Sequence, residues 1–379
     1  MRFSRVVLEN WRNFKHVEVS LFNRAFLVGP NASGKSNFLD ALRFLRDIVS
    51  LGGGFQQSVA TRGGVSRIRC LAARRNPDVV VEVALSESED QSWRYRLAFS
   101  QDNNRRPIVK SEQVWKGDHL ELDRPNKNDR SDPDLLYQTN LEQVMANKAF
   151  RDVAEFFRTT SYYHIVPQLI RDPDRSAGRQ ADPFGGDFLE QVSRTDKKTQ
   201  QSRLKRIQAA LKVAVPQLSE LELFKDERGI PHLRGKYEHW RPQGAWQTEI
   251  DFSDGTLRLM GLLWTLLVGS GPILLEEPEL SLHPEVVRQI PQMIARVQRK
   301  RPPRQVILST HSSDLLSDDG IGVNEVLLFV PDEEGTKVEP VEHMEDAKRL
   351  LESGINLAEI AMAKTSPRDV RQLSLFEEQ

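Results

Sequence analysis

The sequence is poor in cysteine, in net charge and in long apolar runs, and each shortage excludes a class of protein. Cys70 is the only cysteine in 379 residues, which excludes an intramolecular disulfide and a cysteine-rich zinc site. The formal net charge is −1, so any DNA contact must come from a local patch rather than a global field. The longest apolar region, Leu257 to Leu275, contains Arg258 and a Gly-Ser-Gly-Pro turn, which favours a core helix, a turn and a buried strand over a membrane span. No secretory signal is recognised, and we expect a cytoplasmic protein without a membrane partner.

One glycine-rich loop has the pattern and the flanks of a phosphate-binding loop. Gly29 to Ser36 read G-x-x-x-x-G-K-S, between an apolar run, Ala25–Val28, and a stretch of helical periodicity. Such glycines let backbone N–H groups surround phosphate oxygens, and the following helix presents its positive end. Lys35 can then reach the β- and γ-phosphates of ATP, while Ser36 can ligate Mg²⁺. The residues expected to bind ATP here are Gly29, Pro30, Asn31, Ala32, Ser33, Gly34, Lys35, Ser36 and Asn37.

A second buried run, Ile273–Leu275, ends in two adjacent carboxylates, Glu276 and Glu277. Open α/β sheets bind ligands at the carboxyl ends of their strands, so the pair meets the nucleotide if this strand lies beside Ala25–Val28. Glu276 then suits the Mg²⁺ shell, and Glu277 suits orienting or deprotonating the attacking water. A solvated strand end is the alternative interpretation of the pair.

The run Val306–Thr310 repeats this arrangement, with His311 as its polar tip. His311 can hydrogen-bond the γ-phosphate or the attacking water. A single histidine after a strand is more often structural, so its interpretation depends on the other motifs.

Taken in order, these motifs and Ser253–Thr256 resemble the Walker A, signature, Walker B, D-loop and H-loop of ABC-type ATPases. More narrowly, Phe252–Arg258 and Glu276–Pro284 resemble the bacterial AAA/ABC-type ATPases grouped with OLD, RecF and SMC proteins, many of which are linked to phage defence or DNA repair. The resemblance implies an α/β fold, an ABC-type P-loop ATPase head with a mixed sheet, an antiparallel β subdomain and a helical insertion. It implies Mg²⁺-dependent ATP hydrolysis in a homodimer, in which Ser253 and Gly255 contact the γ-phosphate bound by the other subunit. A plain N-capped helix start would also explain the turn at Ser253.

By the same resemblance Gln168 is the candidate for the Q-loop, with a catalytic and metal-binding role; its rivals are Gln56, Gln57 and Gln113. Arg12 lies in a turn that approaches the nucleotide in relatives, although a solvated arginine is the simpler interpretation.

The chain also departs from these families in several places. Glu276 stands where many ABC proteins have aspartate. The Ser-Asp-Gly-Thr turn argues against a transporter, and about 85 residues between Gln168 and Ser253 leave no room for a long coiled coil. The absence of a Toprim-like carboxylate set after His311 favours a separate effector protein over an intrinsic nuclease. An ATP-gated, non-catalytic scaffold is the alternative function, and a transporter subunit is a more remote one.

We expect four segments along the chain. Residues 1–170 form an ATPase lobe with Walker A and the β subdomain, 171–250 an insertion that begins with a linker at 171–187, 251–363 the lobe with the signature, Walker B and H-loop, and 364–379 a flexible tail. The other expected strands are Phe3–Leu8, Val17–Leu21, Val79–Leu85, Trp93–Phe99, Ser161–Val166, Leu221–Phe224 and Trp246–Phe252. The expected helices are Leu141–Phe157, Thr195–Val215, Leu257–Leu267 and Glu285–Val297, and residues 117–135 are expected to be a solvated loop.

Two features suggest macromolecular partners. Local basic clusters make DNA contact a hypothesis, although charge runs are usually solvated faces. They consist of Arg62, Arg67, Arg69, Arg74 and Arg75, and of Arg296, Arg299, Lys300, Arg301 and Arg304. The tail carries Gln372, Leu373, Leu375 and Phe376 in a pattern similar to the motif by which bacterial proteins bind the replication sliding clamp. An apolar tail that folds back onto its own domain is the alternative.

Overall fold

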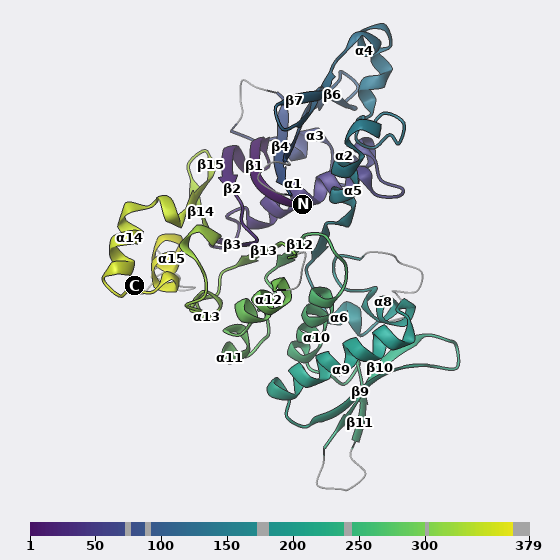
Figure 1. Ribbon diagram of the computed structural model, residues 1–379, viewed down its shortest axis with the longest axis vertical. Coiled ribbons are helices and arrows are strands. Elements are labelled where there is room, and N and C mark those ends of the chain that lie inside the picture. The colour runs from purple at the N-terminus through teal and green to yellow at the C-terminus, as the bar shows by residue number, and fades with distance from the viewer. Residues whose placement is uncertain (73–76, 88–91, 173–181, 239–244, 300–302, 367–379) are drawn as a thin grey trace, which may run out of the picture.

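The computed structural model describes residues 1–72, 77–87, 92–172, 182–238, 245–299 and 303–366, which form three β-sheets with helices between and around them (Figure 1). Two of these sheets have six strands and the third has three. This is the α/β fold with a mixed sheet and an antiparallel β unit that the sequence indicates. The division at residues 170, 250 and 363 stays a prediction. Part of the expected linker and the tail after residue 366 lie outside the described residues.

The central sheet carries the strands on which the sequence motifs lie. Its strand order is β15-β14-β3-β13-β12-β8, and only the edge strand β15 is antiparallel to its neighbour. The strands are β3 (Arg24–Val28), β8 (Ser161–Tyr163), β12 (Ile273–Glu276), β13 (Val306–Thr310), β14 (Val326–Asp332) and β15 (Gly335–Pro340). The condition that the sequence left open is not met as stated: β12 does not lie beside β3, because β13 pairs with both and separates them. The carboxyl ends still share one edge, since Glu276 is in register with Ser309, and Ser309 with Leu27.

An antiparallel sheet of order β2-β1-β4-β5-β6-β7 forms the second layer. Its strands are β1 (Arg2–Trp11), β2 (Phe14–Ser20), β4 (Val79–Ser86), β5 (Ser92–Gln101), β6 (Pro107–Lys116) and β7 (His119–Arg124). The solvated loop expected at residues 117–135 is wrong, because this segment contains β7 and the short helices α4 (Lys127–Ser131) and η1 (Pro133–Tyr137). Arg124 explains why this polar segment is folded. Its buried guanidinium donates to the carboxylates of Asp129 and Glu112, and the latter contact connects the segment to β6.

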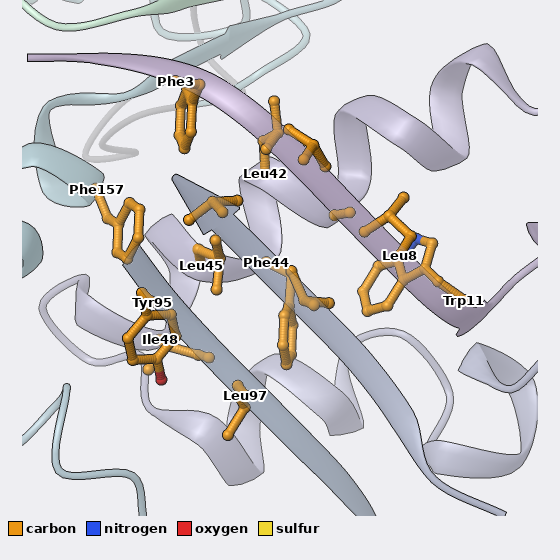
Figure 2. Packing of buried hydrophobic residues seen from close by; sticks show 14 of the residues in the cluster. Phe3, Leu8, Trp11, Leu42, Phe44, Leu45, Ile48, Tyr95, Leu97 and Phe157 are labelled. Carbon is orange, nitrogen blue, oxygen red and sulfur yellow. The ribbon is translucent and has the colours of Figure 1, made fainter. Parts of the chain in front are cut away.

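Helix α1 (Lys35–Val49), which begins at the end of the phosphate-binding loop, is held between these two sheets. Figure 2 shows its Leu42, Phe44, Leu45 and Ile48 among Phe3, Leu8, Trp11, Tyr95 and Leu97 of the antiparallel sheet. Leu274 and Ile307 of the central sheet belong to the same apolar cluster. Because apolar side chains of α1 pack against both sheets, the start of this helix has a fixed position relative to the edge of the central sheet.

Short helices complete this half of the molecule. They are α2 (Phe55–Ala60), α3 (Val65–Ile68), η2 (Lys148–Phe150) and α5 (Arg151–Thr159). The helix expected over Leu141–Phe157 therefore begins only at Arg151. The backbone N–H groups of Asn140 and Leu141 donate to the Glu112 carboxylate, which anchors a turn in place of the expected first helical turns.

The expected insertion, residues 171–250, shares a core with the helices that precede and follow it, beneath the central sheet (Figure 1). The elements of this part are α6 (Pro167–Ile170), α8 (Phe188–Arg194), α9 (Lys197–Ala214), β9 (Leu218–Lys225), β10 (Pro231–Tyr237), β11 (Ala245–Thr248) and α10 (Asp254–Leu267), and the strands form a sheet of order β11-β10-β9. Helix α9 confirms the prediction over Thr195–Val215. The strand expected over Trp246–Phe252 ends at Thr248, and Phe252 turns into this core beside α10.

The remaining helices pack against the face of the central sheet that does not contact α1. They are α11 (Pro284–Val287), α12 (Ile290–Gln298), α13 (Ser313–Leu316), η3 (Val323–Glu325), η4 (Val341–His343), α14 (Glu345–Glu352) and α15 (Leu357–Thr365). The single helix expected over Glu285–Val297 is broken into α11 and α12. Pro291 is the second residue of α12, and a proline is accommodated there because its missing N–H would have no partner inside the helix.

Candidate functional site

The loop between β3 and α1 has the geometry of an anion-binding turn. Ala32 and Gly34 have φ values of 63° and 95°, so the chain reverses twice before α1 begins at Lys35. A Cβ on Gly34 would lie 2.1 Å from Nδ2 of Asn13, so the turn needs glycine both for its φ and for space. The first N–H groups of α1 and its positive end therefore open toward the edge of the central sheet.

Asn13 supports this loop from the β1–β2 turn. Its amide nitrogen donates to the carbonyl of Ser33 (3.2 Å) and to the hydroxyl of Thr336 (2.6 Å), and its oxygen accepts from Asn37 (2.7 Å). Thr336 in turn donates to the carbonyl of Ser33 (2.8 Å). The sequence singled out this turn for Arg12, whose guanidinium instead donates to the carbonyl of Arg67. The role of Asn13 was missed because its partner Thr336 is distant in the chain.

Lys35 is buried, and its ammonium group donates to the carbonyls of Gly29 (2.7 Å) and Pro30 (2.9 Å). Burial lowers the pKa of Lys35, and the carboxylates of Glu277 and Glu276 act in the opposite direction. The loop thus encloses a cation that can exchange backbone carbonyls for the oxygens of a bound phosphate.

Ser36 and Glu276 meet at the sheet edge although a strand separates β3 from β12. The hydroxyl of Ser36 donates to Oε1 of Glu276. A hydroxyl and a carboxylate are oxygen donors of the kind that bind Mg²⁺, which commonly takes one or two protein ligands and completes its shell with phosphate and water. Among the described residues there is no group of three or more His, Cys, Asp or Glu side chains that could hold a metal ion alone. The donor set therefore fits a Mg²⁺ that arrives with a nucleotide.

Glu277 and His311 form the second contact at this edge. Glu277 has a φ of 41°, and its backbone N–H donates to the carbonyl of Ser309 (3.1 Å), so the chain turns sharply as it leaves β12. Its carboxylate oxygen Oε1 lies 3.1 Å from Nδ1 of His311. Because a carboxylate can only accept, Nδ1 of His311 carries a hydrogen and donates it to Glu277.

Glu279, which sequence reasoning missed, holds these two loops together from beneath. Its carboxylate accepts from the hydroxyl of Thr310 and from the backbone N–H of His311. The side chain is buried, and burial raises the pKa of Glu279. The carboxylate thereby ties the turn after β12 to the tip of β13, which fixes Glu277 relative to His311.

The signature turn lies at the start of α10. Ser253 caps this helix, with its hydroxyl accepting from the backbone N–H of Thr256 (3.2 Å). A Cβ on Gly255 would lie 2.6 Å from the carbonyl oxygen of Ser281, so the helix start packs directly on the loop after β12. Gln168 is exposed on α6, and its amide donates to Asp254 (3.1 Å). Gln168 therefore contacts the signature turn. The two other residues expected to bind Mg²⁺, Ser36 and Glu276, contact each other instead.

A cavity of about 470 Å³ opens beside the phosphate-binding loop. It is lined by Gly29, Pro30, Asn31, His311, Pro331, Met362, Thr365 and Ser366. One wall is therefore the end of α15, an element to which the sequence analysis assigned no part in the site.

Comparisons with known proteins agree with this geometry. Residues 24–318 match the family model described as "AAA domain, putative AbiEii toxin, Type IV TA system". A stretch of 58 residues is 45% identical to "Endonuclease GajA" from Bacillus cereus (strain VD045); it covers 15% of this chain and 10% of GajA, so the chain matches only a small part of that relative.

Solved structures of SMC heads share the fold. The SMC head bound to the C-winged helix domain of ScpA aligns with a TM-score of 0.56 at 14% identity, over 92% of this chain and 100% of that chain. The SMC head with an extended coiled coil, bound to the C-terminal domain of ScpA derived from Pyrococcus furiosus, aligns with a TM-score of 0.50 at 12% identity, over 93% and 99% of the two chains. At these identities the likeness shows the fold alone.

The family match confirms the resemblance inferred from the motifs. In the part of the chain that the structure describes, no helix is long and apolar enough to cross a membrane. ATPases of this kind bind ATP with Mg²⁺, and the residues that would do so lie along one edge of the central sheet. The chain belongs to the AAA-domain family described as "putative AbiEii toxin, Type IV TA system", as an ABC-type P-loop ATPase of the OLD/SMC-like group.

Proposed function

We propose that this chain hydrolyses ATP to ADP and phosphate with Mg²⁺, at the edge where α1 meets the ends of β12 and β13. One arrangement carries the proposal. The Ser36–Glu276 contact and the Glu277–His311 hydrogen bond involve adjacent glutamates, and Ser36 is the last residue of the loop that can bind phosphate.

Each side chain has a role that its surroundings support. Lys35 and the N–H groups of the loop bind the phosphates, while Ser36 and Glu276 would hold Mg²⁺, which neutralises phosphate charge. Glu277 orients the attacking water and accepts its proton, and the hydrogen bond from His311 keeps that carboxylate in position.

Two variants test this function, with Glu285→Gln as the control because Glu285 is exposed and pairs with Arg288. We expect Lys35→Ala to lose nucleotide binding and turnover. We expect Glu277→Gln to retain binding, while phosphate release falls about 10²- to 10⁴-fold. Full activity in both variants, or no nucleotide binding by the wild-type protein, refutes the proposal. Normal nucleotide binding with a single-turnover rate far below about 1 s⁻¹ favours the ATP-gated scaffold.

We further propose that two copies clamp two nucleotides, with Ser253 and Gly255 of each facing the γ-phosphate bound by the other. The capped start of α10 supports this, because a helix N-terminus offers N–H groups and a positive dipole to an anion. Glu277→Gln with ATP and Mg²⁺ should sediment as a dimer and without nucleotide as a monomer. A monomer under both conditions contradicts the clamp.

We also propose that this ATPase works in the cytoplasm as the sensor or motor of a DNA-linked system, in anti-phage defence or repair, with a separate effector. Support comes from the 58-residue stretch that is 45% identical to a protein named as an endonuclease. Because the match covers 10% of that protein, the nuclease activity itself is not carried over. A DNA-stimulated ATPase rate, and co-purification with a nuclease or toxin, would test this placement.

The two basic clusters support DNA contact less than their sequence suggests. Arg62 and Arg304 are buried in ion pairs and carbonyl contacts, so neither is available to DNA. Lys300, Arg301, Arg74 and Arg75 lie outside the described residues. The exposed arginines that remain for a phosphate contact are Arg67, Arg69, Arg296 and Arg299. DNA affinity that falls steeply with salt, and falls further when these four are replaced, would support the contact.

The sliding clamp remains a proposed partner through a tail that lies outside the described residues. Gln372, Leu373, Leu375 and Phe376 would make the contact. A peptide of residues 366–379 should bind purified clamp with a Kd near micromolar. Replacing Leu375 and Phe376 by alanine should abolish binding, and equal binding by both peptides removes this partner.

A further inference from the structure

Strand β8, which pairs with β12 at the edge of the central sheet, places Tyr162 next to Glu276, the carboxylate proposed to bind Mg²⁺. Strand β8 runs parallel to β12, with Tyr162 in register with Leu274. Glu276 lies two residues beyond Leu274, and side chains two residues apart share one face of a strand. Tyr162 and Glu276 are therefore diagonal neighbours, within reach of each other's long side chains.

The two side chains meet at the second oxygen of the carboxylate. The hydroxyl of Tyr162 donates to Oε2 of Glu276, while Ser36 donates to Oε1. Each oxygen of Glu276 thus has its own donor from a different element, β8 and α1.

Tyr162 is itself held firmly. Its ring is buried, and the guanidinium of Arg43, from α1, lies over it at 5.0 Å from the ring centre. Because a carboxylate can only accept, the Tyr162 hydroxyl is the donor in its contact with Glu276.

We propose that Tyr162 is a positioning residue for Mg²⁺: it anchors Oε2 of Glu276 so that Oε1 stays turned toward Ser36. Glutamate has one more rotatable bond than the aspartate common at this place, and so its carboxylate has more orientations to lose when it is ordered. A hydrogen bond from a rigid neighbouring strand removes that freedom in advance, as outer partners of metal ligands do. This inference rests on the proposed ATP site.

The change that isolates this contact is Tyr162→Phe, which removes the hydroxyl and keeps the ring beneath Arg43. Tyr163→Phe is the matched control, since it removes the same atom from the adjacent residue, whose side chain points to the opposite face. Calorimetry with a non-hydrolysable ATP analogue gives two quantities for each protein: the affinity in EDTA, and the free Mg²⁺ concentration at half of the Mg²⁺-dependent gain in affinity.

We expect Tyr162→Phe to keep the wild-type affinity in EDTA and to need about 10-fold more Mg²⁺, whereas Tyr163→Phe matches the wild type in both. In a Glu276→Gln background, adding Tyr162→Phe should change nothing further, because the tyrosine acts through that carboxylate. An unchanged Mg²⁺ midpoint in Tyr162→Phe, or an equal further loss in the Glu276→Gln background, overturns the inference and leaves the ATP site standing. A wild-type protein that binds no analogue with or without Mg²⁺ overturns the proposed function and this inference with it.

Discussion

For Arg62, the sequence suggests a contact with DNA, whereas the structure indicates a role in stability. Arg62 lies in a basic cluster that suggested DNA contact, yet only 6% of its side chain is exposed. Its guanidinium donates to Asp40 (2.8 Å) and Asp47 (2.9 Å), both on α1, and to the carbonyl of Ser58 (2.9 Å). Its plane also lies over the ring of Phe44 at 5.2 Å. Arg62 thus stabilises the position of α1, the helix that follows the phosphate-binding loop.

The cost of removing this cation follows from its partners. Breaking one side of a buried ion pair costs about 3–5 kcal/mol, because the other charge stays buried. Here Asp47 keeps Arg46 at 2.6 Å, and Asp40 keeps Arg12 at 3.6 Å. The two carboxylates also remain 20% and 22% exposed, so water compensates part of the loss. We therefore expect the lower end, about 3 kcal/mol, for Arg62→Met.

The matched control is Arg67→Met, because Arg67 belongs to the same cluster and is exposed. The unfolding temperature should drop by about 4 °C in Arg62→Met and stay unchanged in Arg67→Met. Hydrogen exchange in peptides covering α1 should accelerate only in the first variant. If DNA binds, Arg67→Met should lower the affinity. Equal stability of the two variants, or a DNA defect confined to an otherwise stable Arg62→Met, refutes this assignment.

Three further predictions concern the loops around the site and one half-buried carboxylate. Gly255→Ala should lower stability by about 1–3 kcal/mol in urea denaturation, since its Cβ would lie 2.6 Å from the Ser281 carbonyl; an unchanged midpoint would contradict that packing. Asn13→Ala should cost about 1–3 kcal/mol and speed hydrogen exchange in residues 30–36, because the carbonyl of Ser33 loses a donor; unchanged exchange there would remove its supporting role. Burial raises the pKa of Glu142 to about 7, so its stabilising contribution is complete below pH 4.5 and is lost as the pH rises through 7. Wild-type stability should therefore fall relative to that of Glu142→Gln between pH 5 and pH 8, as measured by thermal unfolding, and a constant difference would contradict the raised pKa.

The sequence alone determined the parts of the site that are local. A strand, a glycine loop and a helix follow one another within the 26 residues Arg24–Val49, so periodicity and the G-x-x-x-x-G-K-S spacing were enough to find α1 and the loop before it. The carboxylates at the end of β12, Glu276 and Glu277, were likewise found from the apolar run that precedes them. Signals of this kind depend on neighbours in the chain, which a single sequence displays directly.

Only the tertiary structure decided which distant segments lie next to one another. It inserted β13 between β3 and β12, brought Tyr162 to Glu276, and brought Asn13 and Thr336 to the same carbonyl. It also turned Arg62 from a surface charge into a buried anchor. Strand order and burial depend on how whole layers pack, so they follow from the sum of many long-range contacts, none of which has a pattern in the local sequence.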